Sequence, residues 1–163
     1  MKNEIQPNIC QFSFKEFGSC VYLITLNNQN ILIDTSSKDN QHELLRDLKQ
    51  LNLSPDDINT IIITHRHWDH NSNIALFQNA KIYDYKNIDS FPIKEFQIFK
   101  VPGHSRDSIA ILYNKVLFSG DTLFHNGIGR TDLPESEPEK MQDSLNKLKS
   151  LDYKILCPCI VRY

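Results

Sequence analysis

The sequence lacks the features of a membrane, secreted or nucleic-acid-binding protein. No apolar run approaches the roughly 20 residues of a membrane-spanning helix, and the first ten residues, MKNEIQPNIC, contain no apolar signal-peptide region. The 18 basic and 20 acidic side chains give a formal charge of -2, without the basic surplus usual for a general nucleic-acid binder. We therefore expect neither a membrane nor a nucleic acid as a partner.

Cysteine is also scarce. The four cysteines, Cys10, Cys20, Cys157 and Cys159, are too few and too scattered for a disulfide scaffold in a chain of 163 residues. Together with the missing export signal, this favours reduced thiols and a cytoplasmic location. Cys157 and Cys159 flank a single proline, which is not the Cys-x-x-Cys spacing of redox motifs or zinc knuckles.

Repeats, low-complexity tracts and linker-like runs are absent as well, so we expect a single domain over residues 1–163. Hydrophobic patterns predict helices at residues 40–51 and 138–151. They predict strands at residues 19–26, 30–34, 60–64, 80–85, 96–101, 108–113, 116–119 and 153–157. Strands that begin in a hairpin, with helices interspersed, predict a layered α/β or α+β sandwich.

Side chains of the types that bind metal ions follow one predicted strand at close spacing. The strand at residues 60–64 runs directly into HRHWDH, residues 65–70. Residues two apart in an extended segment face the same way, so His65 and His67 can bind one ion together. A turn then presents Asp69 and His70 to a second position. Imidazole and carboxylate together suit zinc, iron or manganese, whereas calcium prefers oxygen ligands.

Two more strands end in metal-type side chains. The strand at residues 96–101 leads to Pro-Gly-His104, and the strand at residues 116–119 leads to Gly-Asp121. We expect His104 to supply a further ligand and the Asp121 carboxylate to bridge two ions. Asp34, after the strand at residues 30–34, is either a carboxylate that orients a ligand histidine or a turn aspartate. His125 is either a substrate contact or a surface histidine.

These motifs resemble the metallo-β-lactamase superfamily. The resemblance rests on His-x-His-x-Asp-His at residues 65–70, Pro-Gly-His at 102–104 and Gly-Asp-Thr-Leu-Phe at 120–124. The stretch GIGRTDLP at residues 127–134 is similar to the glyoxalase II-like branch, the hydroxyacylglutathione hydrolases and their short relatives. The resemblance covers nearly the whole chain and implies a four-layer αββα sandwich. It also implies a metal site at one edge of two facing sheets.

The resemblance assigns ligands to both metal positions. It implies that His65, His67 and His104 hold the first ion, that Asp69 and His70 hold the second, and that Asp121 bridges the two. In this superfamily a further strand ends in a turn whose histidine completes the second position. Here that segment reads Cys-Pro-Cys159-Ile and the sequence stops at Tyr163. We therefore expect an altered or truncated C-terminus, without the final ligand turn and the closing helix.

Cys159 is a candidate soft replacement for the missing histidine. We expect zinc in one or two positions, with the second position weak or vacant. Iron is the alternative ion.

The resulting functional hypothesis is a metal-dependent thioester hydrolase. A bound ion lowers the pKa of water towards about 7, and the hydroxide attacks a thioester such as hydroxyacylglutathione. Asp69 is the candidate catalytic residue, because its carboxylate can orient that water or accept its proton. Arg130 either holds a substrate carboxylate or forms an ion pair with Asp132 within the loop. A small molecule, with a glutathione conjugate as one option, is the expected substrate.

Besides lactone hydrolysis, which is a further reaction within the superfamily, two alternatives stay open. Persulfide dioxygenases also resemble this sequence, and their single iron implies only His65, His104 and Asp121 as ligands. The other alternative is a catalytically impaired metal-binding or structural domain, because the last ligand is missing. A sheet flank left uncovered by the missing helix would favour a homodimer, or aggregation if unprotected.

Overall fold

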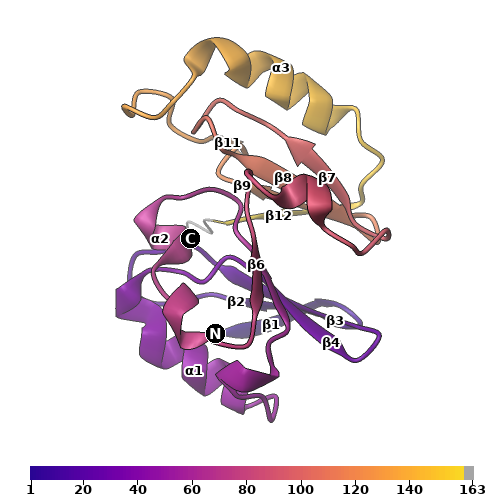
Figure 1. The fold of residues 1–163 in the computed structure, drawn as a ribbon. Coiled ribbons are helices and arrows are strands. Elements are labelled where there is room, and N and C mark those ends of the chain that lie inside the picture. The colour runs from indigo at the N-terminus through magenta and orange to yellow at the C-terminus, as the bar shows by residue number, and fades with distance from the viewer. Residues whose placement is uncertain (160–163) are drawn as a thin grey trace. The chain divides into compact units, whose positions relative to one another are not determined.

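The computed structural model describes residues 1–159 and divides into two compact units, Met1–Tyr83 and Asp84–Tyr163. Each unit consists mainly of one β-sheet with an α-helix packed on it (Figure 1). None of the helices in this described part of the chain is long and apolar enough to cross a membrane. The expectation of one domain over residues 1–163 stays a prediction.

The first unit contains a six-stranded sheet in the order β1-β2-β3-β4-β5-β6. Its strands are β1 (Lys2–Gln6), β2 (Ile9–Phe12), β3 (Val21–Leu26), β4 (Gln29–Ile33), β5 (Thr60–Ile62) and β6 (Lys81–Tyr83). The first four strands are antiparallel, and β4, β5 and β6 run parallel. Asn27 and Asn28 join β3 to β4 with φ of 51° and 62°, as a two-residue hairpin turn requires.

Helix α1 (Gln41–Lys49) covers one face of this sheet. Leu44 and Leu48 lie one helical turn apart, so they share a face and pack into a buried cluster with Leu32 and Ile61. The helix lies in the crossover between the parallel strands β4 and β5. Because β4 and β5 are parallel, their carboxyl ends meet at one edge of the sheet, where Asp34 and His65 follow them.

The second unit contains a four-stranded sheet in the order β12-β9-β8-β7. Its strands are β7 (Gln97–Lys100), β8 (Ile109–Tyr113), β9 (Val116–Gly120) and β12 (Ile155–Pro158). Helix α3 (Pro138–Lys149) packs on it through Met141, Leu145 and Leu148. Strands β7 and β9 are both antiparallel to β8, and β12 is parallel to β9. The carboxyl ends of β7, β9 and β12 therefore share one sheet edge.

The structure confirms every predicted strand and both predicted helices, with ends shifted by a few residues. Sequence patterns missed β1, which is mostly exposed and has no apolar alternation, and β2, which is only four residues long. They also missed the two-residue strands β10 (Leu123–Phe124) and β11 (Gly127–Ile128), and the short helix α2 (Trp68–Asn71). The predicted loss of a ligand turn and closing helix concerns residues 160–163, which lie outside the described residues.

Candidate metal centre

In the first unit, the turn after β5 brings the histidines of residues 65–70 together. His67 is extended, with φ of -64° and ψ of 145°, and α2 begins at the next residue. The chain reverses there, so the ring centroids of His65 and His70 lie 4.0 Å apart. The rings of His65 and His67 meet edge to face at 4.5 Å between centroids.

The side chains of this cluster lie close together, and most of them are buried. His65 and His70 are fully buried, Asp69 is 7% exposed and His67 is half-buried. Nε2 of His65 lies 2.9 Å from Nδ1 of His67, and Nε2 of His70 lies 3.9 Å from a carboxylate oxygen of Asp69. The structure thus brings together the four predicted ligands of this unit. Their role as ligands stays a prediction.

A buried carboxylate, Asp34, organises this cluster from the end of β4. Its Oδ1 accepts the main-chain N–H of Thr64 at 2.8 Å, and its Oδ2 accepts the Thr64 hydroxyl at 2.8 Å. Nδ1 of His70 lies 2.9 Å from the same Oδ2. Asp34 also has a φ of 60°, a left-handed conformation that aspartate tolerates. The two readings of Asp34 left open by the sequence therefore both hold, since the residue turns the chain and orients a histidine.

These hydrogen bonds define the tautomers of two histidines. An ionised carboxylate only accepts, so the ring proton of His70 lies on Nδ1 and points to Asp34. The Thr64 hydroxyl gives its one hydrogen to Asp34 and therefore accepts from Nδ1 of His65, 3.1 Å away. A neutral ring with its proton on Nδ1 has an unprotonated Nε2, which is the form that binds a metal ion.

Main-chain hydrogen bonds hold the helix that carries Asp69 and His70. The N–H of Thr35 donates to the carbonyl of His70 at 2.7 Å, and the N–H of Ser19 donates to that of Asp69 at 2.9 Å. These contacts fix α2 against the segments that follow β2 and β4. Charged and imidazole groups on such a rigid support keep their geometry when a ligand binds.

In the second unit, His104 and Asp121 lie at the shared carboxyl edge of β7 and β9. His104 is 4% exposed and Asp121 is 7% exposed. Nε2 of His104 lies 3.7 Å from a carboxylate oxygen of Asp121. Nδ1 of His104 lies 2.8 Å from the main-chain carbonyl of Arg130. A carbonyl only accepts, so Nδ1 carries a proton, and in the neutral imidazole Nε2 is then again the unprotonated nitrogen.

Cys159 lies at the same sheet edge as Asp121. It follows β12, is fully buried, and its main-chain N–H donates to the carbonyl of Gly120 at 3.3 Å. A thiolate at this place is a suitable zinc ligand in chemical type. Its use as the replacement donor stays a prediction, and the neighbouring Ile160 lies outside the described residues.

The two predicted substrate contacts lie at the surface. The Arg130 guanidinium binds the Asp132 carboxylate through two hydrogen bonds of 2.9 and 3.0 Å. Hydrogen bonding to Arg130 lowers the pKa of Asp132, and the same hydrogen bond raises the pKa of Arg130. The structure thus shows the ion pair expected as the alternative for Arg130. His125 is exposed in the turn between β10 and β11, and both substrate roles stay predictions.

The donor sets of the two units fit a divalent metal in chemical type. The first unit offers three imidazoles and one carboxylate, and the second offers one of each. Nitrogen and oxygen donors in this mixture suit zinc, iron or manganese.

Sequence reasoning missed Thr64 and the Arg130 carbonyl, which set the tautomers of His65 and His104. A hydroxyl residue directly before the first histidine was the available signal for Thr64, but a main-chain carbonyl has no sequence signature.

Comparison with known families gives the same assignment as the motifs. The family model described as the metallo-beta-lactamase superfamily matches residues 15–88 and 85–159, which is nearly the whole chain. The chain belongs to this superfamily. The resemblance inferred from the motifs is therefore confirmed, and membership supports a hydrolase-type enzyme with a metal cofactor.

Curated relatives of this superfamily member include metallo-hydrolases. A probable metallo-hydrolase of Methanocaldococcus jannaschii is 34% identical over 139 residues, covering 77% of this chain and 68% of the relative. The hydroxyacylglutathione hydrolase of Francisella tularensis subsp. holarctica is 32% identical over 115 residues. That match covers 58% of this chain but only 46% of the relative, so the chain spans less than half of that enzyme.

Solved structures confirm the fold class predicted from the sequence. TTHA1623 in a di-iron-bound form has a TM-score of 0.76 at 24% identity, with 93% of this chain and 92% of that chain covered. ETHE1 from Myxococcus xanthus has a TM-score of 0.74 at 23% identity, with 94% and 76% covered. At these identities the likeness establishes the metallo-β-lactamase fold and leaves the choice between zinc and iron open.

Proposed function

We propose that this chain is a metal-dependent hydrolase of thioesters, with hydroxyacylglutathione as the model substrate. The match to a hydroxyacylglutathione hydrolase at 32% identity is the observation that supports this substrate class. The fixed histidine tautomers in both units support the metal dependence. Each of His65, His70 and His104 is buried and directs its Nδ1 to a hydrogen-bond acceptor, so that the neutral ring offers Nε2 to an ion.

The proposal assigns one metal centre to the ligands of both units. His65, His67 and His104 would hold the first ion, Asp69 and His70 the second, and Asp121 would bridge them. This assignment follows the superfamily motif and the donor chemistry of each unit. When bound, such an ion lowers the pKa of a water molecule towards about 7 and polarises a carbonyl group.

The residues of this chain carry the remaining steps. Asp69 is the carboxylate proposed to orient the attacking water or to accept its proton. Asp34 keeps the proton of His70 on Nδ1, so that the imidazole binds the ion with the opposite nitrogen. The thiolate that departs from a thioester needs little protonation, so no separate general acid is required.

Replacing His67 with alanine tests the ligand assignment. We expect the His67→Ala chain to lose most of its bound metal, because Nδ1 of His67 faces Nε2 of His65 at 2.9 Å. Metal content per chain, measured by elemental analysis on protein purified without added metal, reports the result. His42→Ala is the matched control, because His42 is exposed on α1. Full metal content in the His67→Ala chain would refute the assignment.

Turnover of a glutathione thioester tests the activity itself. We expect hydrolysis that a chelator abolishes and added zinc restores. No turnover by a folded chain with full metal content would overturn the thioesterase proposal. It would leave a metal-binding domain without this activity.

Iron chemistry is a second candidate function. The likeness to TTHA1623 in a di-iron-bound form and to ETHE1 supports testing iron as well as zinc. A mononuclear iron dioxygenase that acts on persulfides would need only His65, His104 and Asp121 as ligands. Iron at about one equivalent, together with oxygen consumption in the presence of glutathione persulfide, would favour this candidate over the hydrolase.

A further inference from the structure

A single segment, residues 127–137, contacts His104 at both its ring and its main chain. The Arg130 carbonyl accepts the ring Nδ1–H of His104 at 2.8 Å. The Ser136 hydroxyl donates to the carbonyl of His104 at 2.7 Å, and the Glu137 N–H donates to the carbonyl of Gly103 at 2.9 Å. The ring, the carbonyl of His104 and the carbonyl of the preceding residue are therefore all held by the 127–137 segment.

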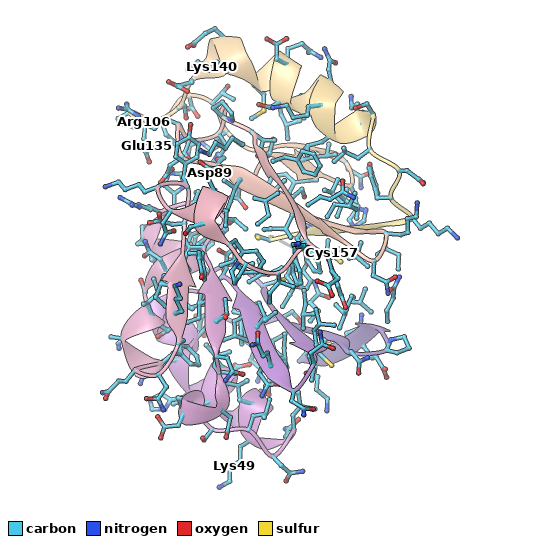
Figure 2. All side chains as sticks on the ribbon, turned by 45° about the vertical axis from the view of Figure 1, so that its right-hand side comes forward. Lys49, Asp89, Arg106, Glu135, Lys140 and Cys157 are labelled. Carbon is cyan, nitrogen blue, oxygen red and sulfur yellow. The ribbon has the colours of Figure 1, made fainter. Side chains whose placement is uncertain are left out.

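The same segment also holds the far side of the His104 loop. The main-chain N–H of Arg106 donates to the carbonyl of Glu135 at 3.0 Å, and Figure 2 shows these two residues close together. Within the segment, the side chain of Arg130 is occupied by its two hydrogen bonds to Asp132. The Arg130 side chain therefore faces the exposed Asp132 while its carbonyl faces the buried His104.

Gly129 is the residue that allows this close approach. A Cβ at this position would lie 1.9 Å from the carbonyl oxygen of Asp121 and 2.9 Å from Nδ1 of His104. Real Cβ atoms essentially never approach other heavy atoms within 3.0 Å. Any other residue here would push the Arg130 carbonyl away from His104, displace Asp121, or do both. Gly127 has open space instead, with no atom within 4 Å of a Cβ built there.

We infer that Gly129 and the main-chain carbonyl of Arg130 are positioning elements that fix the tautomer and the direction of His104 for a divalent metal ion. The inference rests on the proposed metal centre. It assigns a positioning role to the GIGRTDLP stretch at residues 127–134. This role is not evident from the side chains, because Arg130 acts through its main-chain carbonyl. Partners of this kind behind a ligand histidine change metal affinity by roughly 10- to 100-fold.

Gly129→Ala and Gly127→Ala form a matched pair for the test. We expect Gly129→Ala to weaken the binding of Co²⁺ by roughly 10- to 100-fold, with a change in the visible spectrum of the bound ion. Gly127→Ala should bind Co²⁺ as the wild type does. Equal Co²⁺ affinity in the Gly129→Ala and wild-type chains would overturn the inference.

A milder variant covers the case in which Gly129→Ala does not fold. Ser136→Ala removes only the hydroxyl that donates to the carbonyl of His104. We expect a folded chain, shown by an unchanged circular dichroism spectrum, with Co²⁺ affinity lowered by about 10-fold. Unchanged Co²⁺ affinity in folded Ser136→Ala would contradict the claim that the segment positions His104.

The tautomer of His104 separates this inference from the proposed function. Nitrogen NMR of the metal-free wild-type chain should show the proton of His104 on Nδ1. If the wild-type chain binds no metal, the proposed function fails, whereas this measurement still decides the inference about His104. A proton found on Nε2 would overturn the inference even if the chain binds metal.

Discussion

In the first unit, side chains orient the histidine rings of the predicted metal site, whereas in the second unit a main-chain carbonyl orients the ring of His104. Asp34 reaches His70 directly and His65 through the Thr64 hydroxyl. His104 is held instead by the carbonyl of Arg130. Both kinds of hydrogen bond place a proton on Nδ1, and the neutral ring then has its lone pair on Nε2.

Orientation by a side chain and orientation by a main-chain carbonyl differ in their energetic cost and in which mutations can disturb them. A buried carboxylate loses its hydration, and the three hydrogen bonds that Asp34 accepts offset that cost. A main-chain carbonyl carries no net charge and exists whatever the side chain is. The first unit should therefore be sensitive to substitution of the residues behind its histidines. The second should be sensitive where a substitution moves the backbone or removes the Ser136 hydroxyl that holds the main chain of His104.

The largest expected effect comes from Asp34→Asn. Asparagine tolerates the left-handed φ of 60° at this position, but its amide replaces one accepting oxygen by a donor. Each buried donor left unsatisfied costs about 1–3 kcal/mol of unfolding free energy, and the altered tautomer of His70 should weaken zinc binding by roughly 10- to 100-fold. Urea unfolding and zinc titration measure the two effects.

Asp47→Asn is the matched control for that change. Asp47 is 2% exposed on α1 and pairs with Arg46 rather than with a histidine. It should lose stability without losing zinc affinity. If Asp34→Asn bound zinc as tightly as the wild type, the side-chain half of the comparison would be wrong.

Thr64→Val should have a smaller effect on the same unit. Valine keeps the β-branched shape but removes the hydroxyl between Asp34 and His65, while the main-chain N–H to Asp34 remains. We expect about 10-fold weaker zinc binding and a loss of about 1–3 kcal/mol in unfolding free energy. Thr64→Ser restores a hydroxyl and should recover most of the zinc affinity. If Thr64→Ser bound zinc as weakly as Thr64→Val, the loss of zinc affinity would be due to altered packing and not to the missing hydroxyl.

The sequence predicted the parts of this arrangement that side-chain patterns encode. The β-branched run at residues 60–64 marks β5, and the following His-x-His-x-Asp-His pattern places metal-type donors at its end. The sequence leaves two roles open for Asp34, because neither its spacing nor its residue type indicates that parallel pairing of β4 and β5 brings it to Thr64. Such a contact depends on the register between strands distant in the chain.

Other features were beyond sequence reasoning for a physical reason. The sequence marks Arg130 by the charge of its side chain, yet the group that contacts His104 is its main-chain carbonyl. The sequence shows that residue 129 is a glycine, but it does not show which atoms a Cβ at that position would contact. The strands β1 and β11 are short and mostly exposed, so they carry no hydrophobic alternation for a pattern to detect.

Arg130→Ala should have the smallest effect and gives the sharpest contrast with Gly129→Ala. The carbonyl of residue 130 remains, so zinc affinity should match the wild type. Arg130 lowers the pKa of Asp132 below its ordinary value of 3.8. The exposed ion pair therefore stabilises the fold above that pH, and its contribution disappears as the pH falls through the lowered pKa. Because surface pairs contribute little, urea unfolding should show a slight loss at neutral pH that vanishes on acidification. A large loss of zinc affinity would mean that the Arg130 side chain acts on the metal site, and the contrast between the two units would fail.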